Sequence, residues 1–236
     1  MKKLIMASMV GLSVSGAAFA EGQLNVYNWS DYIAEDTIAN FEKETGIKVT
    51  YDMYDSNEVL EAKMSAGSSG YDVVVPTADF LARGRQAGVY AEIDFTRLSN
   101  LKNQSQQVQG LANKQMNDTK AGLVYMWGTT GIAYNEKKIA ERLGKNAPTN
   151  SWSLILDPAN AAKLADCGIA ILDAPTDVLP NVIAYMGQPG DTTDGKLFQQ
   201  AGDVLNKVRP YLRYIHSSQS INDMANGDID RKSTRL

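Results

Sequence analysis

The most constraining feature of the sequence is a threefold alternation of strand-like and helix-like segments near its start. Strand-forming residues occupy 24–27, 47–51 and 71–75, and each is followed by a segment with apolar residues at helical spacing, at 36–44, 57–66 and 80–87. Strands that alternate with helices form parallel sheets with crossover helices. We therefore predict a doubly wound α/β lobe, and the apolar run 71–75 predicts a strand buried on both faces.

A second pattern of the same kind follows a polar stretch. Residues 95–120 are rich in Gln and Asn and predict a surface excursion with a short helix, and the strand-like stretch 123–134, broken by Gly128 and Gly131, predicts a crossing between lobes. Beyond it we expect strands at 168–172 and 211–214 and helices at 137–143, 151–156, 159–164, 177–186, 195–208 and 219–225. The fold class is α/β, with a first lobe at 21–131 and an incomplete second lobe at 132–229.

The first twenty residues predict a secretory signal peptide. Lys2 and Lys3 precede an apolar stretch from residue 4 to about residue 14, and Ala18-Phe19-Ala20 fits the small-x-small cleavage rule. The apolar stretch is shorter than the roughly 20 residues that span a bilayer. We expect cleavage after Ala20 and a mature protein in the periplasm.

The last seven residues look foreign to the rest. Asp228 and Ile229 should begin an apolar strand, but the chain continues as Asp-Arg-Lys-Ser-Thr-Arg-Leu over 230–236. This segment can be encoded by DNA that resembles a sequencing adapter. We predict that 230–236 is not native and that the second sheet is one strand short.

Net charge and cysteine content limit the classes of binding partner and the possible states of the thiol. The chain has 23 basic and 27 acidic residues, and loss of Lys2 and Lys3 leaves a net charge of −6, which argues against nucleic acid or an anionic membrane as a partner. Cys167 is the one cysteine of this exported chain. It is either a buried thiol or half of a disulfide whose partner is missing.

Candidate binding residues follow three of the expected strands. Ligands of open α/β sheets bind at the carboxyl ends of strands, where the sequence places the runs Trp29-Ser30-Asp31-Tyr32, Pro76-Thr77-Ala78-Asp79-Phe80 and Asp173-Ala174-Pro175-Thr176-Asp177. Carboxylates beside aromatic rings suit an organic ammonium ion. Each residue also has a simpler reading: Asp31 or Asp79 as a helix cap, Asp177 as a partner of a helix dipole, Trp29 as core.

Enzyme signatures are absent from the sequence. It contains no G-x-S-x-G, H-E-x-x-H, P-loop or G-x-G-x-x-G motif. His216 is the only histidine, which excludes a zinc site built from several histidines, and we interpret it as structural although Ser217 and Ser218 follow it. We predict no catalytic residues, no metal and no cofactor. A secreted α/β hydrolase remains the alternative from the enzyme class.

Four longer runs carry a resemblance that extends over residues 22–229. They are Val26-Tyr27-Asn28-Trp29-Ser30-Asp31-Tyr32-Ile33, Tyr125-Met126-Trp127-Gly128-Thr129-Thr130-Gly131-Ile132-Ala133-Tyr134-Asn135, Leu172-Asp173-Ala174-Pro175 and Tyr214-Ile215-His216-Ser217-Ser218-Gln219. Together they resemble the bacterial polyamine receptors, the periplasmic binding proteins of ABC importers, and in particular those that bind putrescine. The resemblance implies a two-lobed type II periplasmic binding fold, ligand capture by lobe closure, a monomer, and delivery to an inner-membrane ABC permease.

The resemblance also implies a ligand set, namely Trp29, Ser30, Asp31, Thr77, Asp79, Asp177 and Ser217, with Tyr32 from the same opening run. Asp31 and Asp177 would hold the cation while Trp29 packs along its aliphatic chain. The family carries Glu where this chain has Asp177 and a small hydroxyl residue where it has Asp79, so the extra carboxylate would favour a longer polyamine such as spermidine.

The family pattern continues beyond this chain. The resemblance implies further pocket residues, a return of the chain to the first lobe, and a cysteine just after Ile229 that would pair with Cys167. We therefore expect the chain as given to fold poorly and bind weakly. Two other functions stay open: a polyamine sensor without a transport role, and a receptor of the same fold for another solute such as ferric iron.

Overall fold

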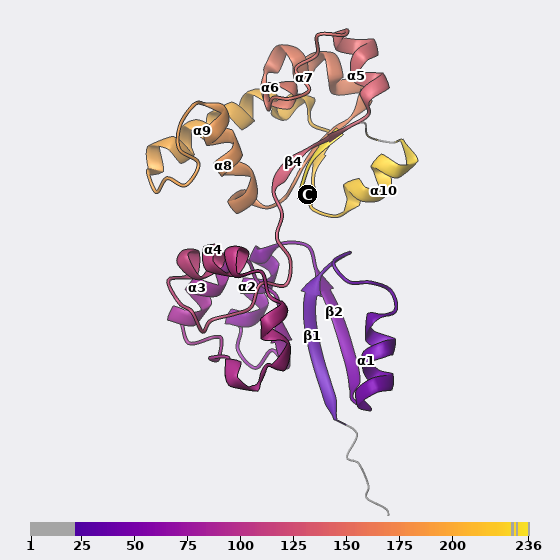
Figure 1. Cartoon of the computed structure of the whole chain (residues 1–236). Coiled ribbons are helices and arrows are strands. Elements are labelled where there is room, and N and C mark those ends of the chain that lie inside the picture. The colour runs from indigo at the N-terminus through magenta and orange to yellow at the C-terminus, as the bar shows by residue number, and fades with distance from the viewer. Residues whose placement is uncertain (1–21, 228, 230, 236) are drawn as a thin grey trace, which may run out of the picture.

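The computed structural model describes residues 22–227, 229 and 231–235. The signal segment expected at 1–20 lies outside the described residues. The described chain forms two α/β lobes, and β4 (Thr130–Tyr134) rises from the first into the second (Figure 1). In the described part of the chain, no helix has both the length and the apolar character needed to cross a bilayer.

A three-stranded parallel sheet organises the first lobe. β1 (Gln23–Trp29) lies between β2 (Lys48–Tyr54) and β3 (Val73–Val74). α1 (Thr37–Thr45) connects β1 to β2, and α2 (Asn57–Ser65) connects β2 to β3. The observed order of strands and helices confirms the alternation predicted from the sequence. The helices supply the crossover connections that parallel strands need.

Local signals set the ends of these helices. Gly46 ends α1 in the left-handed conformation, with φ at 72°, and its N–H donates to the carbonyl of Glu42. Ser56 begins α2, and its Oγ accepts a hydrogen bond from the Val59 N–H at 3.3 Å. Because both signals lie within a few residues of the helix, the sequence alone locates α1 and α2 to within one residue.

The remainder of the first lobe is helical and irregular. It comprises α3 (Ala78–Gln86), η1 (Phe95–Arg97), η2 (Ser99–Asn103) and α4 (Gln106–Met116). α4 is longer than the short helix expected in this polar stretch, and it contacts α3. In Figure 1, α3 and α4 lie beside α2, on the opposite side of the lobe from α1.

The crossing between the lobes is less regular than its sequence indicates. Residues 123–129 have no regular secondary structure, and the strand begins only at Thr130. The prediction of a strand over 123–134 is therefore wrong for its first half. These residues line a hollow instead of pairing within a sheet, and the Tyr125 hydroxyl donates to the carbonyl of Tyr32.

The second lobe places its helices around a mixed sheet. Its helical elements are α5 (Glu136–Leu143), α6 (Ser153–Leu156), α7 (Pro158–Leu164), η3 (Ala165–Cys167), α8 (Pro175–Tyr185), α9 (Gly195–Val208), η4 (Arg209–Tyr211) and α10 (Gln219–Asn226). The strand expected at 211–214 is displaced, because Pro210 helps form η4 and the strand β6 is Tyr214–Ile215.

The second sheet has an unexpected member. Its order is β4-β7-β5-β6, where β5 is Ile169–Ile171 and β7 is Arg231–Arg235. β7 pairs antiparallel with β4 and parallel with β5. The expectation of a sheet one strand short is wrong for this chain, since backbone N–H and C=O groups can complete a ladder whatever the side chains are. Residues 228, 230 and 236 lie outside the described residues.

The two lobes differ in how well their sheets are covered. A large core of fully buried residues, including Leu154, Ile169 and Ile183, fills the second lobe. In the first lobe the buried cluster is small and lies on the α2 side of the sheet, around Tyr27, Trp29, Tyr54, Leu60 and Met64.

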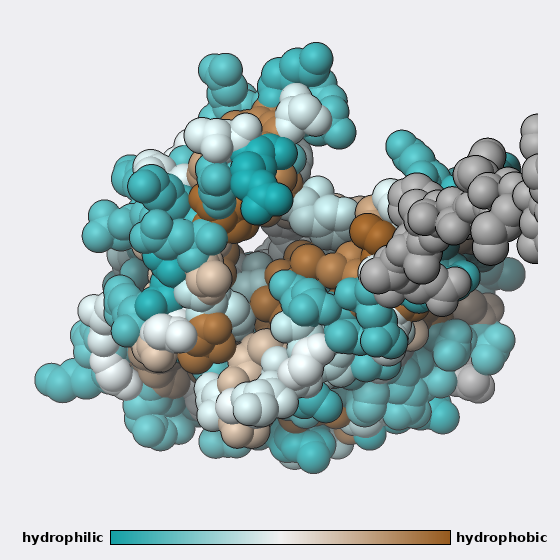
Figure 2. Space-filling model, turned by 90° about the horizontal axis from the view of Figure 1, so that it is seen from below, coloured by the Kyte–Doolittle hydropathy of each residue, from teal (hydrophilic) through white to brown (hydrophobic). Residues whose placement is uncertain are grey.

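The opposite face of the first sheet is open, and we call it the open sheet face. It carries Leu24, Val26, Val49, Tyr51 and Val73, which register places on one side. Val73 is 45% exposed because no described element covers it, so the prediction that this strand is buried on both faces is wrong. Seen from below, hydrophobic residues line a hollow in the molecule (Figure 2).

Candidate ligand-binding cleft

A hollow of about 1900 Å³ follows the first lobe and reaches the second. Pockets for small molecules usually measure about 300–1000 Å³, so one ligand would occupy only part of it. One part follows the open sheet face. The other lies between the lobes, and we call it the interlobe cleft; it is lined by Trp29, Tyr32, Thr77, Asp79, Thr176 and Asp177.

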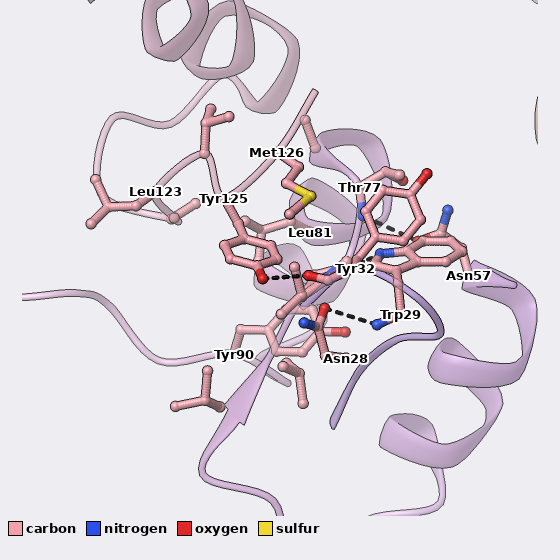
Figure 3. A pocket seen from close by; sticks show the side chains of 18 of the residues that line it. Asn28, Trp29, Tyr32, Asn57, Thr77, Leu81, Tyr90, Leu123, Tyr125 and Met126 are labelled. Atoms are coloured by element: carbon pink, nitrogen blue, oxygen red, sulfur yellow. Dashed lines mark hydrogen bonds between the residues drawn. The ribbon is translucent and has the colours of Figure 1, made fainter. Parts of the chain in front are cut away.

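Trp29 is a fixed wall of the interlobe cleft. It is the last residue of β1 and only 9% exposed, and its Nε1 donates to the carbonyl of Val75 at 2.8 Å. Its ring lies 4.7 Å from that of Tyr54 and 6.4 Å from that of Tyr32, tilted to both. Figure 3 shows Trp29 and Tyr32 side by side at the pocket. Trp29 can therefore be both a core residue and a ligand contact, because its ring packs in the buried cluster and also lines the hollow.

Ser30 and Asp31 form the turn that leaves β1. The Ser30 N–H donates to the carbonyl of Tyr54 at 2.9 Å, and Asp31 takes φ of 64°. Aspartate tolerates this left-handed conformation better than most residues. Asp31 is exposed, and neither residue is among the described residues that line the hollow. Asp31 is also not the cap of α1, a position held by Asp36.

Thr77 and Asp79 lie at the start of α3, directly after the third strand. Thr77 is the N-cap residue, and its Oγ1 donates to Oδ1 of Asp79 at 2.5 Å. The Thr77 N–H is held at 3.1 Å by Oδ1 of Asn57, which is 1% exposed. Because the Thr77 hydroxyl donates its hydrogen bond to Asp79, the lone pairs of Thr77 Oγ1 can accept hydrogen bonds from a ligand.

The second lobe contributes the start of α8. Asp177 lies in its first turn and is half-buried. Next to it, Thr176 Oγ1 donates to Oε1 of Glu58 at 2.9 Å, a contact between the lobes. Oε2 of Glu58 is buried and has no hydrogen-bond partner among the described residues. The two lobes therefore meet at the cleft through a hydroxyl and a carboxylate.

Ser217 lies outside the residues that line the hollow. Its Oγ donates to the carbonyl of Asp173 at 3.2 Å. The adjacent Ser218 contacts the first lobe, with its Oγ donating to Oδ2 of Asp55 at 3.2 Å. The structure thus brings together Trp29, Tyr32, Thr77, Asp79 and Asp177 of the expected ligand set, and leaves Ser30, Asp31 and Ser217 out of the hollow's lining.

The charge of the hollow has a single sign. Among the described residues that line it, every charged one is acidic: Asp72, Asp79, Glu92 and Asp177. Glu92 is paired with Arg85 at 3.2 Å, and Oδ2 of Asp72 accepts the N–H of Asn25 at 2.8 Å. Asp79 and Asp177 are the two that lie at the interlobe cleft.

Tyrosines line the same hollow in their neutral form. A hydrogen bond of 2.7 Å from the Tyr71 hydroxyl to Oδ2 of Asp52 raises the pKa of Tyr71 to about 12. Burial raises the pKa of Tyr90, with a smaller effect from Glu61, and burial also raises the pKa of Tyr51. At neutral pH these residues present uncharged rings and hydroxyl groups.

Metal-ligating side chains and the thiol are the next features of the described residues. They contain no group of three or more His, Cys, Asp and Glu side chains able to hold a metal ion. Cys167 is buried, with its Sγ 3.4 Å from Oδ1 of Asp166. The disulfide implied by the resemblance stays a prediction.

Sequence reasoning missed several residues of the cleft. Asn57 orients Thr77, Thr176 contacts Glu58, and Tyr125 holds the Tyr32 loop from the crossing segment, as the dashed line in Figure 3 shows. Asn57 opens α2 and reads as an ordinary helix start. Two of them carried a signal: Thr176 lies in the run before Asp177, and Tyr125 begins one of the four runs that carry the resemblance.

Comparison with known proteins agrees with this geometry. The chain is 51% identical over 227 residues to the putrescine-binding periplasmic protein PotF of Escherichia coli and 48% identical over 229 residues to the putrescine-binding periplasmic protein SpuD of Pseudomonas aeruginosa. Each match covers 96% of this chain but only 61% and 62% of the relative. The chain therefore spans about three fifths of the relatives' length.

Solved structures show the same fold. A putative spermidine/putrescine ABC transporter protein from Listeria monocytogenes superposes with a TM-score of 0.78 at 26% identity, over 91% of this chain and 62% of that one. The TpPotD lipoprotein of Treponema pallidum gives 0.76 at 26% identity, over 90% and 63%. A family model described as bacterial extracellular solute-binding protein matches residues 36–230. With two α/β lobes, a cleft between them and this match over most of its length, the chain belongs to the bacterial extracellular solute-binding protein family.

Proposed function

We propose that the protein captures polyamines in the periplasm, putrescine first and spermidine as a second ligand, and passes them to an inner-membrane ABC permease. The observation that carries the proposal is the chemistry of the hollow: its charged lining residues in the described chain are all acidic, and aromatic rings stand beside them. An anion receptor would need arginines or clustered backbone N–H groups instead.

The proposed roles rest on the residues that line the interlobe cleft. An ammonium group between Asp79 and Asp177 gains charge-assisted hydrogen bonds, and one over an aromatic face gains roughly 0.5–2 kcal/mol. The methylene chain of a diamine packs on the rings of Trp29 and Tyr32, which lie 6.4 Å apart. Thr77 accepts a further N–H. These contacts together replace the water that a diamine loses on binding.

Ser30, Asp31 and Ser217 stay in the proposed ligand set. Ser30 and Asp31 follow β1, whose last residue, Trp29, lines the cleft, and Ser217 follows β6 after His216. The carboxyl ends of strands are where ligands bind in such sheets. Closure of the lobes would move these three residues toward the ligand.

The relatives support the transport role. PotF and SpuD are named as putrescine-binding periplasmic proteins, and the structural neighbours include ABC transporter proteins. The hydrolase alternative is not favoured, because the relatives are solute-binding proteins. We propose a signal peptide at 1–20 and a monomeric mature protein that acts with a permease.

We also propose that the native chain continues beyond residue 229 and returns to the first lobe at 21–131. Three observations support this: the relatives are longer, Val73 on the open sheet face is 45% exposed, and an interior strand of the second sheet has the polar sequence of 231–235. Interior strands of such sheets are usually apolar. Sequencing the gene from an independent clone tests the proposal, and an unchanged tail followed by a stop codon would refute it.

A thermal-shift panel on the complete gene product tests the ligand class. Putrescine, spermidine and a dicarboxylate of similar length are compared at equal concentration. We expect the melting temperature to rise with both amines, since a ligand at 100 times its Kd adds about 2.7 kcal/mol to stability, and to stay unchanged with the dicarboxylate. A rise with the dicarboxylate alone would contradict the proposal.

A further inference from the structure

The imidazole of His216 caps a helix at the edge of the interlobe region. His216 follows β6 and precedes α10, and its Nδ1 lies 3.1 Å from the N–H groups of both Ser218 and Gln219. Ser218, the N-cap residue of α10, makes no side-chain cap of its own. The first N–H groups of a helix need such an acceptor, and here the histidine ring supplies it.

The turn held by this ring carries two hydroxyl groups that bind other parts of the protein. Ser217 Oγ donates to the carbonyl of Asp173, and Ser218 Oγ donates to Oδ2 of Asp55 in the first lobe. The backbone N–H of His216 is itself tied to the carbonyl of Ile171 at 2.9 Å. With the backbone fixed on one side, the ring determines how the turn continues into α10.

We propose that His216 is a positioning residue of the ligand cleft and a pH-sensitive one. Its neutral ring fixes the turn that carries Ser217, a residue of the proposed ligand set, and Ser218, which contacts Asp55 of the first lobe. A protonated ring carries a hydrogen on Nδ1, which then faces two N–H donors, so both hydrogen bonds are lost. Histidine changes charge between about pH 5 and 8. Ligand affinity therefore falls on acidification. The inference rests on the proposed function for its ligand.

Other charged groups lie around the turn. They are the carboxylates of Asp55 in the first lobe, Asp173 after β5 and Asp223 on α10, which accepts from Gln219 Nε2 at 3.2 Å. Arg213 is the cation nearest in sequence. Of the side-chain types around the turn, histidine is the one whose ordinary charge change falls between about pH 5 and 8.

Two substitutions of His216 test whether its role is to accept the hydrogen bonds that cap α10. His216→Asn keeps an acceptor close to the position of Nδ1 and cannot be protonated, whereas His216→Ala removes the acceptor. Asp194→Ala is the matched control: Oδ1 of Asp194 caps α9 in the same lobe, accepting from the Lys196 N–H at 2.9 Å, and Asp194 is not among the residues of the hollow.

Calorimetric titration of the complete protein with putrescine, at about pH 7.5 and about pH 5.5, tests the inference. We expect the native protein to lose about tenfold in affinity at the lower pH, the size of one lost helix cap. His216→Asn should bind equally at both pH values, and His216→Ala should bind weakly at both. Asp194→Ala should keep the native pH dependence. Equal affinity and equal pH dependence in all four proteins would overturn the inference.

Nitrogen NMR of the ring separates this inference from the proposed function. In the ligand-free protein at neutral pH, the ring signal that disappears in His216→Asn should report a proton on Nε2 and none on Nδ1. A proton on Nδ1 would overturn the positioning role even if putrescine binds. If putrescine binds at neither pH while the ring shows the expected tautomer, the ligand assignment fails and the capping role stands.

Discussion

The side chains at the cleft are held in different ways, and this decides what each substitution would reveal. Trp29 is anchored by the carbonyl of Val75 and packed against Tyr54, so its removal would damage the fold together with binding. Asp79 and Asp177 lie at helix starts, where an isosteric amide can replace them with little strain. Carboxylate-to-amide changes are therefore the cleaner probes of ligand recognition.

Asp79→Asn and Asp177→Asn should each weaken putrescine binding by about tenfold or more, because a hydrogen bond to a charged group contributes roughly 1.5–3 kcal/mol. Calorimetry on the complete protein measures the effect. Asp191→Asn, an exposed loop residue that does not line the hollow, serves as the control. Native affinity in both cleft variants would show that these carboxylates do not contact the ligand.

The hydrogen bond of Tyr71 predicts how the stability of the protein changes at alkaline pH. The pKa of Tyr71 is about 12 in the folded protein, above the usual value of 10.0, because its hydroxyl donates to Asp52. The folded state keeps this proton longer than the unfolded state, so the contact stabilises the protein below pH 10 and the stabilisation is lost as the pH rises toward 12.

Denaturant unfolding of the native protein and of Tyr71→Phe checks this. The difference in stability between the two proteins should shrink as the pH rises above 10, while ultraviolet absorbance should show a late-ionising tyrosine in the native protein that Tyr71→Phe lacks. A difference that does not depend on pH would contradict the assigned hydrogen bond.

The elements follow the sequence where the signals that determine them are local. Gly46 ends α1 and Ser56 begins α2, and both are visible in a window of a few residues. β3 is shorter than the apolar run 71–75. The strand predicted at 211–214 begins only at Tyr214, after the 3-10 turn that contains Pro210. Strand limits depend on neighbours far along the chain, as β7 between β4 and β5 illustrates, and no local pattern encodes such neighbours.

The candidate site residues, too, could be predicted where the signal is local or topological and could not where it depends on contacts between separate elements. Placement after strands located Trp29, Thr77 and Asp177, because the carboxyl edge of a sheet is a property of topology. The pattern could not show that Asn57 orients Thr77, since that contact joins separate elements. Nor could it show that Asp31 leaves the hollow, because its left-handed turn is a detail of the backbone.

At the level of single elements, Ser56→Ala should lower the free energy of unfolding by about 1 kcal/mol, the usual cost of losing an N-cap. Ser56 is buried and caps α2 through the Val59 N–H. Ser105→Ala, at the exposed cap of α4, is the matched comparison and should cost less. Urea unfolding of both variants measures the difference, and a larger loss for Ser105→Ala would contradict the assignment of α2 to the first-lobe core.

On the scale of the whole molecule, the open sheet face predicts a difference between this chain and the complete protein. Hydrophobic residues line the hollow along this face, and we expect them to bind a dye such as ANS strongly in a protein that ends at residue 229. In the complete gene product the returning segment should cover the face and reduce dye fluorescence. Equal fluorescence in two folded proteins would mean that nothing covers it.

The central claim is that acidic side chains and aromatic rings between two lobes recognise the charge of an organic diamine. Calorimetry of the complete protein with putrescine, and with the diol of the same length in which hydroxyls replace the ammonium groups, tests it most directly. We predict a micromolar Kd for putrescine, near −8 kcal/mol, and no detectable heat with the diol. Equal binding of both compounds, or binding of an anion with no response to any polyamine, would contradict the account.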